Sequence, residues 1–209
     1  MPLAHQPSMW DVAERAELTP LAGRVVRTEL SGGAWIDSLP GWVAGSEEVL
    51  DVLLGDIGWR ADRRQMYDRE VAVPRLLRWY GGNATLPHPL LTQARAELNR
   101  YYGPEPGEEF VSAGMCLYRD GRDSVAWHGD RLGRGRSSDT LVAIVAFGSP
   151  RPLMLRPADG GAGRKLPLGH GDLAVMGGSC QRTWEHCIPK TAKQVGPRVS
   201  VQFRPTGVA

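Results

Sequence analysis

The sequence predicts a mainly β fold, a sandwich or double-sheet jelly roll with flanking helices. From Phe110 onward, short apolar runs alternate with turns rich in glycine and proline, the pattern of packed antiparallel sheets. Two stretches in the first half instead have apolar residues at helical spacing. The 209 residues, 42% hydrophobic and 23% charged, suit one globular domain with a sizeable core.

Residues 23–58 are expected to contain short strands and one helix. Between Gly23 and Trp42, apolar pairs on either side of Gly32-Gly33 indicate strands and turns. Ser46 can cap a helix whose first turn carries two acids, and Gly55 can end it. The apolar stripe of this helix comprises Val49, Leu50, Leu53 and Leu54.

Residues 59–80 combine arginines with aromatic side chains. Guanidinium groups suit phosphates and aromatic faces suit base stacking, so this segment could hold an extruded base. Alternatively, the aromatic residues are core positions of two hairpin strands and the arginines lie in solvent. The arginines are Arg60, Arg63, Arg64, Arg69, Arg75 and Arg78, and the aromatic residues are Trp59, Tyr67, Trp79 and Tyr80.

A second helix is expected to begin at Pro89 and to end at Gly103-Pro104. Proline suits the first helical position, and the glycine-proline pair stops the helix. The residues facing inward would be Leu90, Leu91, Ala94, Leu98 and Tyr101.

The second half is expected to form about eight short strands. Residues 110–118 should pair as a hairpin with residues 124–128 through a tight turn at 119–122. Residues 141–147 form a continuous apolar run, which indicates a buried strand. Further strands are expected at 152–155, 165–168, 173–176, 184–188 and 198–203, with a glycine-rich turn at 160–163.

Charge is divided unevenly along the chain, although the net charge is only +2. Residues 1–59 carry three basic and nine acidic side chains, whereas residues 60–209 carry 22 basic and 14 acidic ones. A basic second half favours an anionic partner such as nucleic acid.

Cysteine usage and hydropathy bear on location. The three cysteines, Cys116, Cys180 and Cys187, are an odd number without framework spacing, which suits a reducing compartment. No apolar run approaches the ~20 residues that span a bilayer, and the N-terminus lacks a basic-then-apolar leader. The expected location is therefore the cytoplasm, with no membrane partner.

The strongest candidate site combines His128 and Asp130 with His186. Residues two apart on a strand point to the same side, so His128 and Asp130 can share a face. His186 completes a set of two imidazoles and one carboxylate if the chain folds back. Such a set leaves three positions of an octahedral ferrous ion open, as in non-haem oxygenases. Arg198 and Arg204 would supply a counter-charge for a dicarboxylate cosubstrate.

Several motifs follow one another in a recognisable order. They are Met66-Tyr67, Val73-Pro74-Arg75, Tyr80-Gly81, Tyr118-Arg119-Asp120-Gly121, His128-Gly129-Asp130, Gly148-Ser149-Pro150-Arg151, His170-Gly171-Asp172-Leu173, Trp184-Glu185-His186 and the run from Arg198 to Arg204. With these motifs the chain resembles AlkB-type dioxygenases, which depend on 2-oxoglutarate and Fe(II). The resemblance covers roughly residues 65–205.

The resemblance implies a double-stranded β-helix core in a single dioxygenase domain over residues 1–209. Residues 1–58 would be an N-terminal extension with a helix, 59–82 a nucleotide-recognition lid, and 83–209 the helix and jelly-roll catalytic core. The implied cofactors are Fe(II), 2-oxoglutarate and O2. The implied activity is oxidative demethylation of alkylated bases in nucleic acid, with release of formaldehyde, succinate and CO2.

The resemblance also implies roles for individual residues. His128, Asp130 and His186 would form the catalytic iron site. The positions implied to bind 2-oxoglutarate are Tyr118, Arg198, Arg204, Cys116 and Ser200, of which Arg198 would pair with the distal carboxylate. Cys116 and Ser200 depart from the family, which usually has asparagine at both positions.

For the substrate, the implied contacts are Tyr67, Trp79, Tyr80, Arg75, Leu132, Arg131 and Arg134. Leu132 stands where the family often has an acid that holds a cationic methylated base, so this chain departs from the pattern for 1-methyladenine and 3-methylcytosine. The arginines of the same loop favour phosphate, and by analogy with the family Arg131, Arg134, Arg136 and Arg151 are expected around the mouth of the pocket. The expected partner is nucleic acid, DNA rather than RNA and single-stranded, bound by a monomer.

Other interpretations remain open at this stage. The same two histidines and aspartate could hold zinc in a hydrolase, although no general base is evident. Cys180, His186 and Cys187 could belong to a structural zinc site. A non-catalytic nucleic-acid binder on a jelly-roll scaffold would keep the basic segments without needing the triad. A dioxygenase acting on a protein or a small molecule is also compatible with the motifs.

Overall fold

The computed structural model describes residues 15–55, 57–66, 69–82, 84–104, 108–131 and 133–208, and the side chains of these except 64–72. Two short 3-10 turns lie at Ser31–Gly33 and Arg134–Arg136. The helices are α1 (Glu47–Leu54), α2 (Pro89–Tyr102) and α3 (Cys180–Thr183). The strands are β1 (Glu17–Leu18), β2 (Val26–Glu29), β3 (Ala34–Leu39), β4 (Val43–Ala44), β5 (Arg60–Met66), β6 (Arg69–Tyr80), β7 (Phe110–Tyr118), β8 (Val125–His128), β9 (Val142–Gly148), β10 (Leu153–Pro157), β11 (Arg164–Leu166), β12 (Leu173–Gly178), β13 (Trp184–Ile188) and β14 (Arg198–Pro205).

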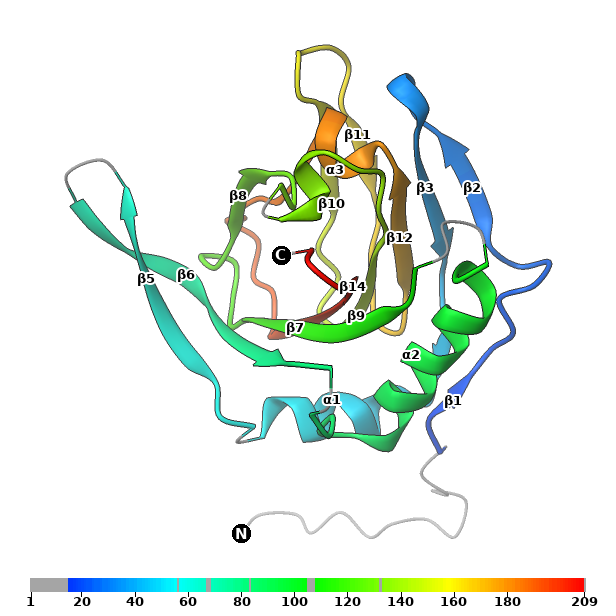
Figure 1. Cartoon of the computed structure of the whole chain (residues 1–209). Helices are drawn as coiled ribbons and strands as arrows, with labels where there is room; N and C mark the ends of the chain where they lie inside the picture. Colours follow the sequence, from blue (N-terminus) through cyan, green and yellow to red (C-terminus); the bar gives the residue numbers. More distant parts are fainter. Residues whose placement is uncertain are drawn as a thin grey trace, which may run out of the picture.

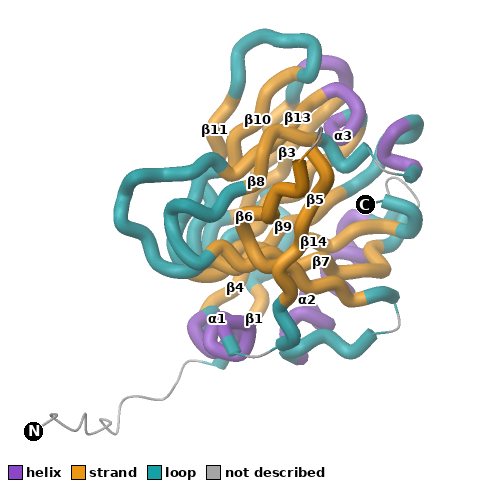
Figure 2. The backbone as a smooth tube through the Cα atoms, turned by 90° about the vertical axis from the view of Figure 1, so that its left-hand side faces the viewer, coloured by secondary structure: helices purple, strands orange, loops and turns teal. Residues whose placement is uncertain are grey.

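Most of the described strands belong to two sheets that face each other (Figures 1 and 2). The large sheet has the order β2-β3-β12-β9-β14-β7-β6-β5, and the small sheet has the order β11-β10-β13-β8. Apolar side chains of both sheets, such as Ile144 and Leu155, meet in one buried cluster between them. The predicted mainly β jelly roll is therefore confirmed, and its interior is where the candidate site lies.

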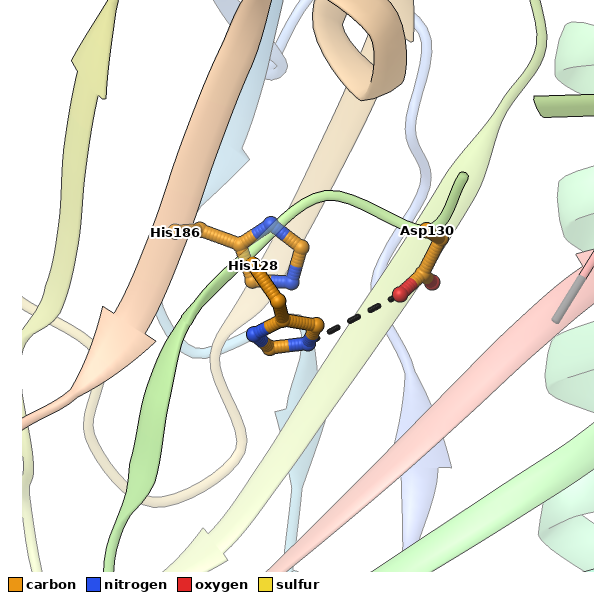
Figure 3. Close-up of side chains that lie close together, drawn as sticks. All are labelled: His128, Asp130 and His186. Carbon is orange, nitrogen blue, oxygen red and sulfur yellow. Dashed lines mark ion pairs between the residues drawn. The ribbon is translucent and has the colours of Figure 1, made fainter. Parts of the chain in front are cut away.

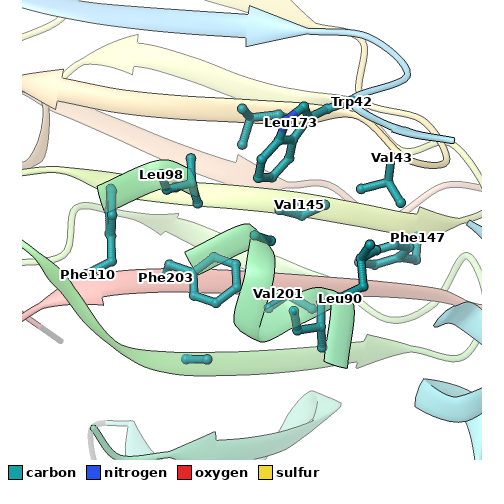
Figure 4. Packing of buried hydrophobic residues seen from close by; sticks show 14 of the residues in the cluster. Trp42, Val43, Leu90, Leu98, Phe110, Val145, Phe147, Leu173, Val201 and Phe203 are labelled. Carbon is teal, nitrogen blue, oxygen red and sulfur yellow. The ribbon is translucent and has the colours of Figure 1, made fainter. Parts of the chain in front are cut away.

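The other face of the large sheet is covered by α1 and α2 (Figure 1). Figure 4 shows Leu90 and Leu98 of α2 beside Val145, Val201 and Phe203 of the sheet. These side chains are all at most 3% exposed. Burial of this kind contributes about 1.5–3 kcal/mol for each large apolar side chain, so the helices fix the sheet that carries the site. No described helix is long and apolar enough to cross a membrane.

Two details of the helices differ from the sequence prediction. The Ser46 hydroxyl makes no capping hydrogen bond, and Leu54 of the expected apolar stripe is 36% exposed. In α2, Tyr101 is 36% exposed and Tyr102 is buried instead. Tyr102 lies four residues after Leu98 and so on the same helix face. Its hydroxyl donates to Asp37, at 3.0 Å, which fixes the end of the helix.

The predicted hairpin between residues 110–118 and 124–128 is wrong. β7 pairs with β14 and β6 in the large sheet, whereas β8 pairs with β13 in the small one. The connection crosses between sheets because Asp123 accepts hydrogen bonds from the backbone N and the guanidinium of Arg119, at 2.8–2.9 Å. The Arg151 guanidinium then donates to three backbone carbonyls around this turn. The prediction that Arg151 lies at the mouth of the site is therefore wrong, because Arg151 is only 2% exposed.

β5 and β6 form a hairpin that projects from the body of the molecule (Figure 1). At the base of this hairpin, each of the two interpretations of residues 59–80 holds for some of the aromatic residues. Tyr80 is 9% exposed and packs in the core, and the Trp59 indole donates to the Leu53 carbonyl at 3.0 Å. Trp79, the neighbour of Tyr80 on β6, is 52% exposed. The aromatic residues are therefore divided between the core and the surface.

Candidate active site

One face of the large sheet supplies most of the polar side chains of the site. Successive residues of a strand point to opposite sides, so every second residue of β14 faces the small sheet. These residues are Arg198, Ser200, Gln202 and Arg204, and their partners across the ladder on β7 are Tyr118, Cys116, Gly114 and Ser112. The alternation in the run from Arg198 to Arg204 is the reason why this sequence places a row of polar groups in the interior.

The two histidines come from neighbouring strands of the small sheet. His128 ends β8 and His186 lies in β13, directly opposite in the strand register, with ring centroids 4.2 Å apart. Asp130 follows in the loop, and its Oδ1 lies 3.7 Å from Nε2 of His128 (Figure 3). One ligand atom from each of the three residues lies within 4.8 Å of the others. The structure thus brings the predicted triad together.

The geometry of the triad suits a divalent metal. Nδ1 of His128 lies 2.8 Å from the carbonyl oxygen of Ala126, which can only accept, so Nδ1 carries a hydrogen and Nε2 is the ring nitrogen that faces Asp130. Burial, followed by the proximity of His128, lowers the pKa of His186 to about 3, and its ring is neutral. For Asp130, burial favours the neutral acid, but Arg204 and the histidines outweigh it and lower the pKa to about 2. The set is two imidazoles and one carboxylate, which matches the facial triad of ferrous oxygenases.

Asp130 is held from two sides. Its Oδ2 accepts a hydrogen bond from Nε of Arg204 at 2.8 Å, and its backbone N donates to Oε1 of Gln181 at 3.0 Å. Gly129 permits this fit, because a Cβ there would lie 2.5 Å from the backbone oxygen of Gln181. Gln181 was missed by the sequence analysis, and no local pattern could have found it, since α3 meets the loop only in the folded chain.

A cavity of about 70 Å³ opens beside the triad. Arg198 lines it and is 1% exposed, yet Nε and Nη1 of its guanidinium have no hydrogen-bond partner among the described residues. Burial lowers the pKa of Arg198, but guanidinium remains charged at any ordinary pH. A buried cation without a carboxylate is costly, so the cavity is suited to an anionic guest that brings one. The residues present therefore fit a dicarboxylate cosubstrate.

The four other residues expected to bind 2-oxoglutarate, Tyr118, Arg204, Cys116 and Ser200, line the same cavity. Tyr118 is buried, with its ring under the guanidinium of Arg198 at 5.4 Å, and burial raises the pKa of its hydroxyl, which stays a neutral donor. Ser200 and Cys116 face each other across the strands. Both contact Gln202, which donates to the Ser200 hydroxyl at 2.6 Å. Gln202 was missed, although the alternation between Ser200 and Arg204 could have identified it.

A wider groove of about 650 Å³ adjoins the cavity beneath the β5–β6 hairpin. Arg75, Cys116, Gln202 and Arg204 line both spaces. The groove is otherwise lined by Arg60, Ala61, Asp62, Leu77, Arg78, Trp79, Gly114 and Met115. Of the expected substrate contacts, Arg75 and Trp79 therefore face this groove. Tyr80 lies in the core instead, because alternation turns it away from Trp79.

Of the remaining expected substrate contacts, Tyr67 and Leu132 lie outside the described residues. Arg131 is 4.0 Å from Glu185, and Arg134 forms an ion pair with Glu108, so both arginines have acidic neighbours.

The alternative of a structural zinc site formed by Cys180, His186 and Cys187 is not supported. Cys187 follows His186 on β13 and points to the other side of the strand. Burial, followed by the proximity of Asp130, raises the pKa of Cys180 to about 12, which keeps this thiol protonated. Over the described part of the chain, the triad is the single cluster with metal-ligand spacing.

Comparisons with known proteins find one matching family model and several relatives. Residues 48–204 match the model of the 2OG-Fe(II) oxygenase superfamily. Human "Alpha-ketoglutarate-dependent dioxygenase alkB homolog 3" is 32% identical over 186 residues, which cover 79% of this chain and 64% of that protein. "DNA oxidative demethylase ALKBH2" of Arabidopsis thaliana is 32% identical over 130 residues, 51% of this chain and 41% of that protein.

The solved structure of OsALKBH1 has a TM-score of 0.57 and 14% identity to this chain, and the match covers 85% of this chain and all of that one. This likeness supports the fold alone. The chain spans less than two thirds of the length of the homolog 3 relatives that it matches. Together the matches confirm the resemblance to AlkB-type dioxygenases that the sequence motifs indicate.

Proposed function

The chain belongs to the 2OG-Fe(II) oxygenase superfamily, and we propose that it removes alkyl groups oxidatively from bases of single-stranded nucleic acid. Members of this superfamily use Fe(II), 2-oxoglutarate and O2. The products would be formaldehyde, succinate and CO2 when the alkyl group is methyl. The observation that carries the proposal is the buried guanidinium of Arg198, which lines the same cavity as His128 and His186 and has two nitrogens without a partner among the described residues.

The chain's own residues would hold both cofactors. His128, Asp130 and His186 would bind iron on one face, and Arg198 would pair with a carboxylate of 2-oxoglutarate, with Tyr118 as a neutral donor. When bound, the two would activate O2, the oxidant, so that a C–H bond of the alkyl group is oxidised while 2-oxoglutarate becomes succinate and CO2. Arg204 keeps Asp130 ionised and oriented, because its Nε donates to Oδ2 of that carboxylate. The apolar walls of the cavity, including Val142 and Ile144, exclude water.

The groove beneath the β5–β6 hairpin would receive the substrate. Trp79 is exposed there, and four arginines also line the groove, which suits a base flanked by phosphates. A relative is named as a DNA oxidative demethylase, and the substrate of this chain is proposed in the same class. DNA rather than RNA, a monomeric enzyme and a lid formed by residues 59–82 remain predictions.

The test uses Asp130→Ala with Asp159→Ala as the matched control, since Asp159 is exposed in a turn away from the triad. Iron content after anaerobic purification is measured first. Formaldehyde and succinate are then measured with oligonucleotides that carry 1-methyladenine, 3-methylcytosine or ethenoadenine. The parent and the Asp159 variant should retain iron and release both products, whereas Asp130→Ala should lose iron and turnover, because a facial triad with one ligand removed binds iron weakly.

Two results would contradict the proposal. Full turnover by Asp130→Ala would remove Asp130 from the iron site. Succinate release that depends on a peptide or a small molecule, with no oligonucleotide repaired, would assign the enzyme a different substrate class.

A further inference from the structure

One row of residues crosses the floor of the groove. Trp79 on β6 lies opposite Gly114 on β7, and Gly114 lies opposite Gln202 on β14. All three line the groove, and Gln202 also lines the cavity beside the triad. The row therefore stands where the groove passes into the reaction cavity.

Gly114 lets the side chains around it converge. A Cβ at this glycine would lie 2.9 Å from Nη1 of Arg204 and 3.4 Å from both Oε1 of Gln202 and Cε3 of Trp79. The Trp79 indole, the Gln202 amide and the Arg204 guanidinium therefore lie around the backbone of Gly114, which has no side chain of its own. A planar heterocycle stacked on Trp79 would have its edge beside Gln202 and Arg204.

The orientation of the Gln202 amide follows from its neighbours. Arg204 can only donate, so the atom facing its Nη1 at 3.5 Å must be the amide oxygen. The Cys116 thiol also points to this oxygen, at 3.8 Å. The amide nitrogen donates one hydrogen to the Ser200 hydroxyl at 2.6 Å, which leaves its second N–H for a ligand.

The groups at this end of the groove therefore offer donors and positive charge. Asp62 is the one acidic residue among the described residues that line the groove, and it lies on β5 rather than in this row. The carboxylate nearest to Arg204 is that of Asp130, which Arg204 already binds and which the triad uses. A cationic base would meet the charge of Arg204, whereas a neutral base with carbonyl oxygens on its edge would accept hydrogen bonds.

We propose that Gln202 is a specificity-determining residue that, together with Arg204 and Trp79, selects neutral alkylated bases with carbonyl acceptors over cationic ones. The inference rests on the proposed function and narrows its substrate class. Gln202 would hydrogen-bond to the edge of the base and would not take part in the reaction itself.

The test compares two N3-methylated pyrimidines in otherwise identical single-stranded oligonucleotides. 3-Methylthymine is neutral and presents carbonyl oxygens, whereas 3-methylcytosine is cationic near neutral pH and presents an exocyclic N–H donor. The readouts are kcat/KM for each oligonucleotide and its equilibrium dissociation constant. The parent enzyme should prefer 3-methylthymine in both.

Gln202→Glu keeps the shape of the side chain and replaces its free donor with a negative charge. This variant should shift the preference toward 3-methylcytosine by about tenfold or more, the effect of one hydrogen bond to a charged group. Gln202→Met removes both polar atoms and should weaken the parent's preference without reversing it. Gln93→Glu makes the same charge change at an exposed position of α2 and should leave the preference unchanged.

The outcomes separate this inference from the proposed function. Suppose that the parent enzyme repairs both oligonucleotides and that the preference of Gln202→Glu stays within about twofold of the parent's. Such a change is far below the effect of one hydrogen bond, and the role of Gln202 is then overturned. A parent enzyme that prefers 3-methylcytosine also overturns it. If the parent neither binds nor repairs either oligonucleotide, the proposed function itself fails. Thermal melting checks that each variant folds, and if Gln202→Glu does not fold, an undiminished preference in Gln202→Met overturns the inference.

Discussion

Arg198 carries a full positive charge in a position where the described residues offer no carboxylate to two of its nitrogen atoms. An uncompensated buried cation costs several kcal/mol, and proteins retain one mainly where a ligand completes the pair. Arg204 shows the opposite situation, because its Nε is already bound to Asp130. Two arginines six residues apart on β14 thus have separate tasks, one toward an incoming anion and one toward a metal ligand.

Replacing Arg198 by lysine should weaken 2-oxoglutarate binding by ~1–3 kcal/mol, since the charge stays but the planar fork that matches a carboxylate is lost. The measurement is the dissociation constant of 2-oxoglutarate under anaerobic conditions, together with its KM. Arg164→Lys, at an exposed position of β11, is the control and should bind 2-oxoglutarate as the parent does. An unchanged dissociation constant in Arg198→Lys would mean that another residue anchors the cosubstrate.

Gly129→Ala should disturb the metal site without touching a metal ligand. The added methyl group would lie 2.5 Å from the Gln181 carbonyl, so the loop that carries Asp130 has to move. We expect lower iron retention and a loss of stability of ~1–3 kcal/mol, the usual cost of overpacking. Gly81→Ala is the control, because its methyl group would meet nothing within 4 Å. Equal iron content in both variants would show that Gly129 is not needed for the geometry of the triad.

At the scale of strands and helices, local patterns predicted most elements but not their partners. The apolar run at residues 141–147 correctly indicates buried β9, and the strand expected at residues 198–203 is β14. The connection after Tyr118 looked like a hairpin turn, and only contacts with Arg151, distant in sequence, make it a crossover between sheets. Such contacts leave no local signal, which is also why Gln181 could not be foreseen beside Asp130.

The exposed face of β6 leads to a prediction about Trp79. Because Trp79 is 52% exposed over the groove while its neighbour Tyr80 is in the core, truncation of Trp79 should affect binding more than folding. Trp79→Ala should weaken binding of a single-stranded oligonucleotide by ~1–3 kcal/mol, the range for loss of one stacked base. Tyr101→Ala, at an exposed aromatic residue of α2 on the covered side of the sheet, is the control. Fluorescence anisotropy at low salt measures both, and equal affinities would place the base elsewhere.

At the scale of the whole molecule, the acidic part and the basic part of the chain form different parts of the structure. Residues 1–59, with nine acidic side chains against three basic ones, supply α1 and the strands at one edge of the large sheet. The basic remainder supplies the triad and all the residues that line the cavity and the groove. Acidic neighbours already offset Arg131 and Arg134, while the described residues show no acidic partner for Arg136. The positive potential available to a nucleic-acid strand therefore depends on a few arginines rather than on the net charge.

Affinity for single-stranded oligonucleotides should fall steeply with salt, because each neutralised phosphate releases counterions. In a plot of log affinity against log salt concentration, Arg136→Gln should reduce the slope by about 0.7 if Arg136 contacts one phosphate of a single strand. Arg24→Gln removes the same charge from an exposed position in the acidic part of the chain and should leave the slope unchanged. Equal slopes for the two variants would exclude Arg136 from the path of the strand. A parent enzyme whose binding does not depend on salt would show that phosphate contacts do not drive recognition, and the arginines of the groove would then need another partner.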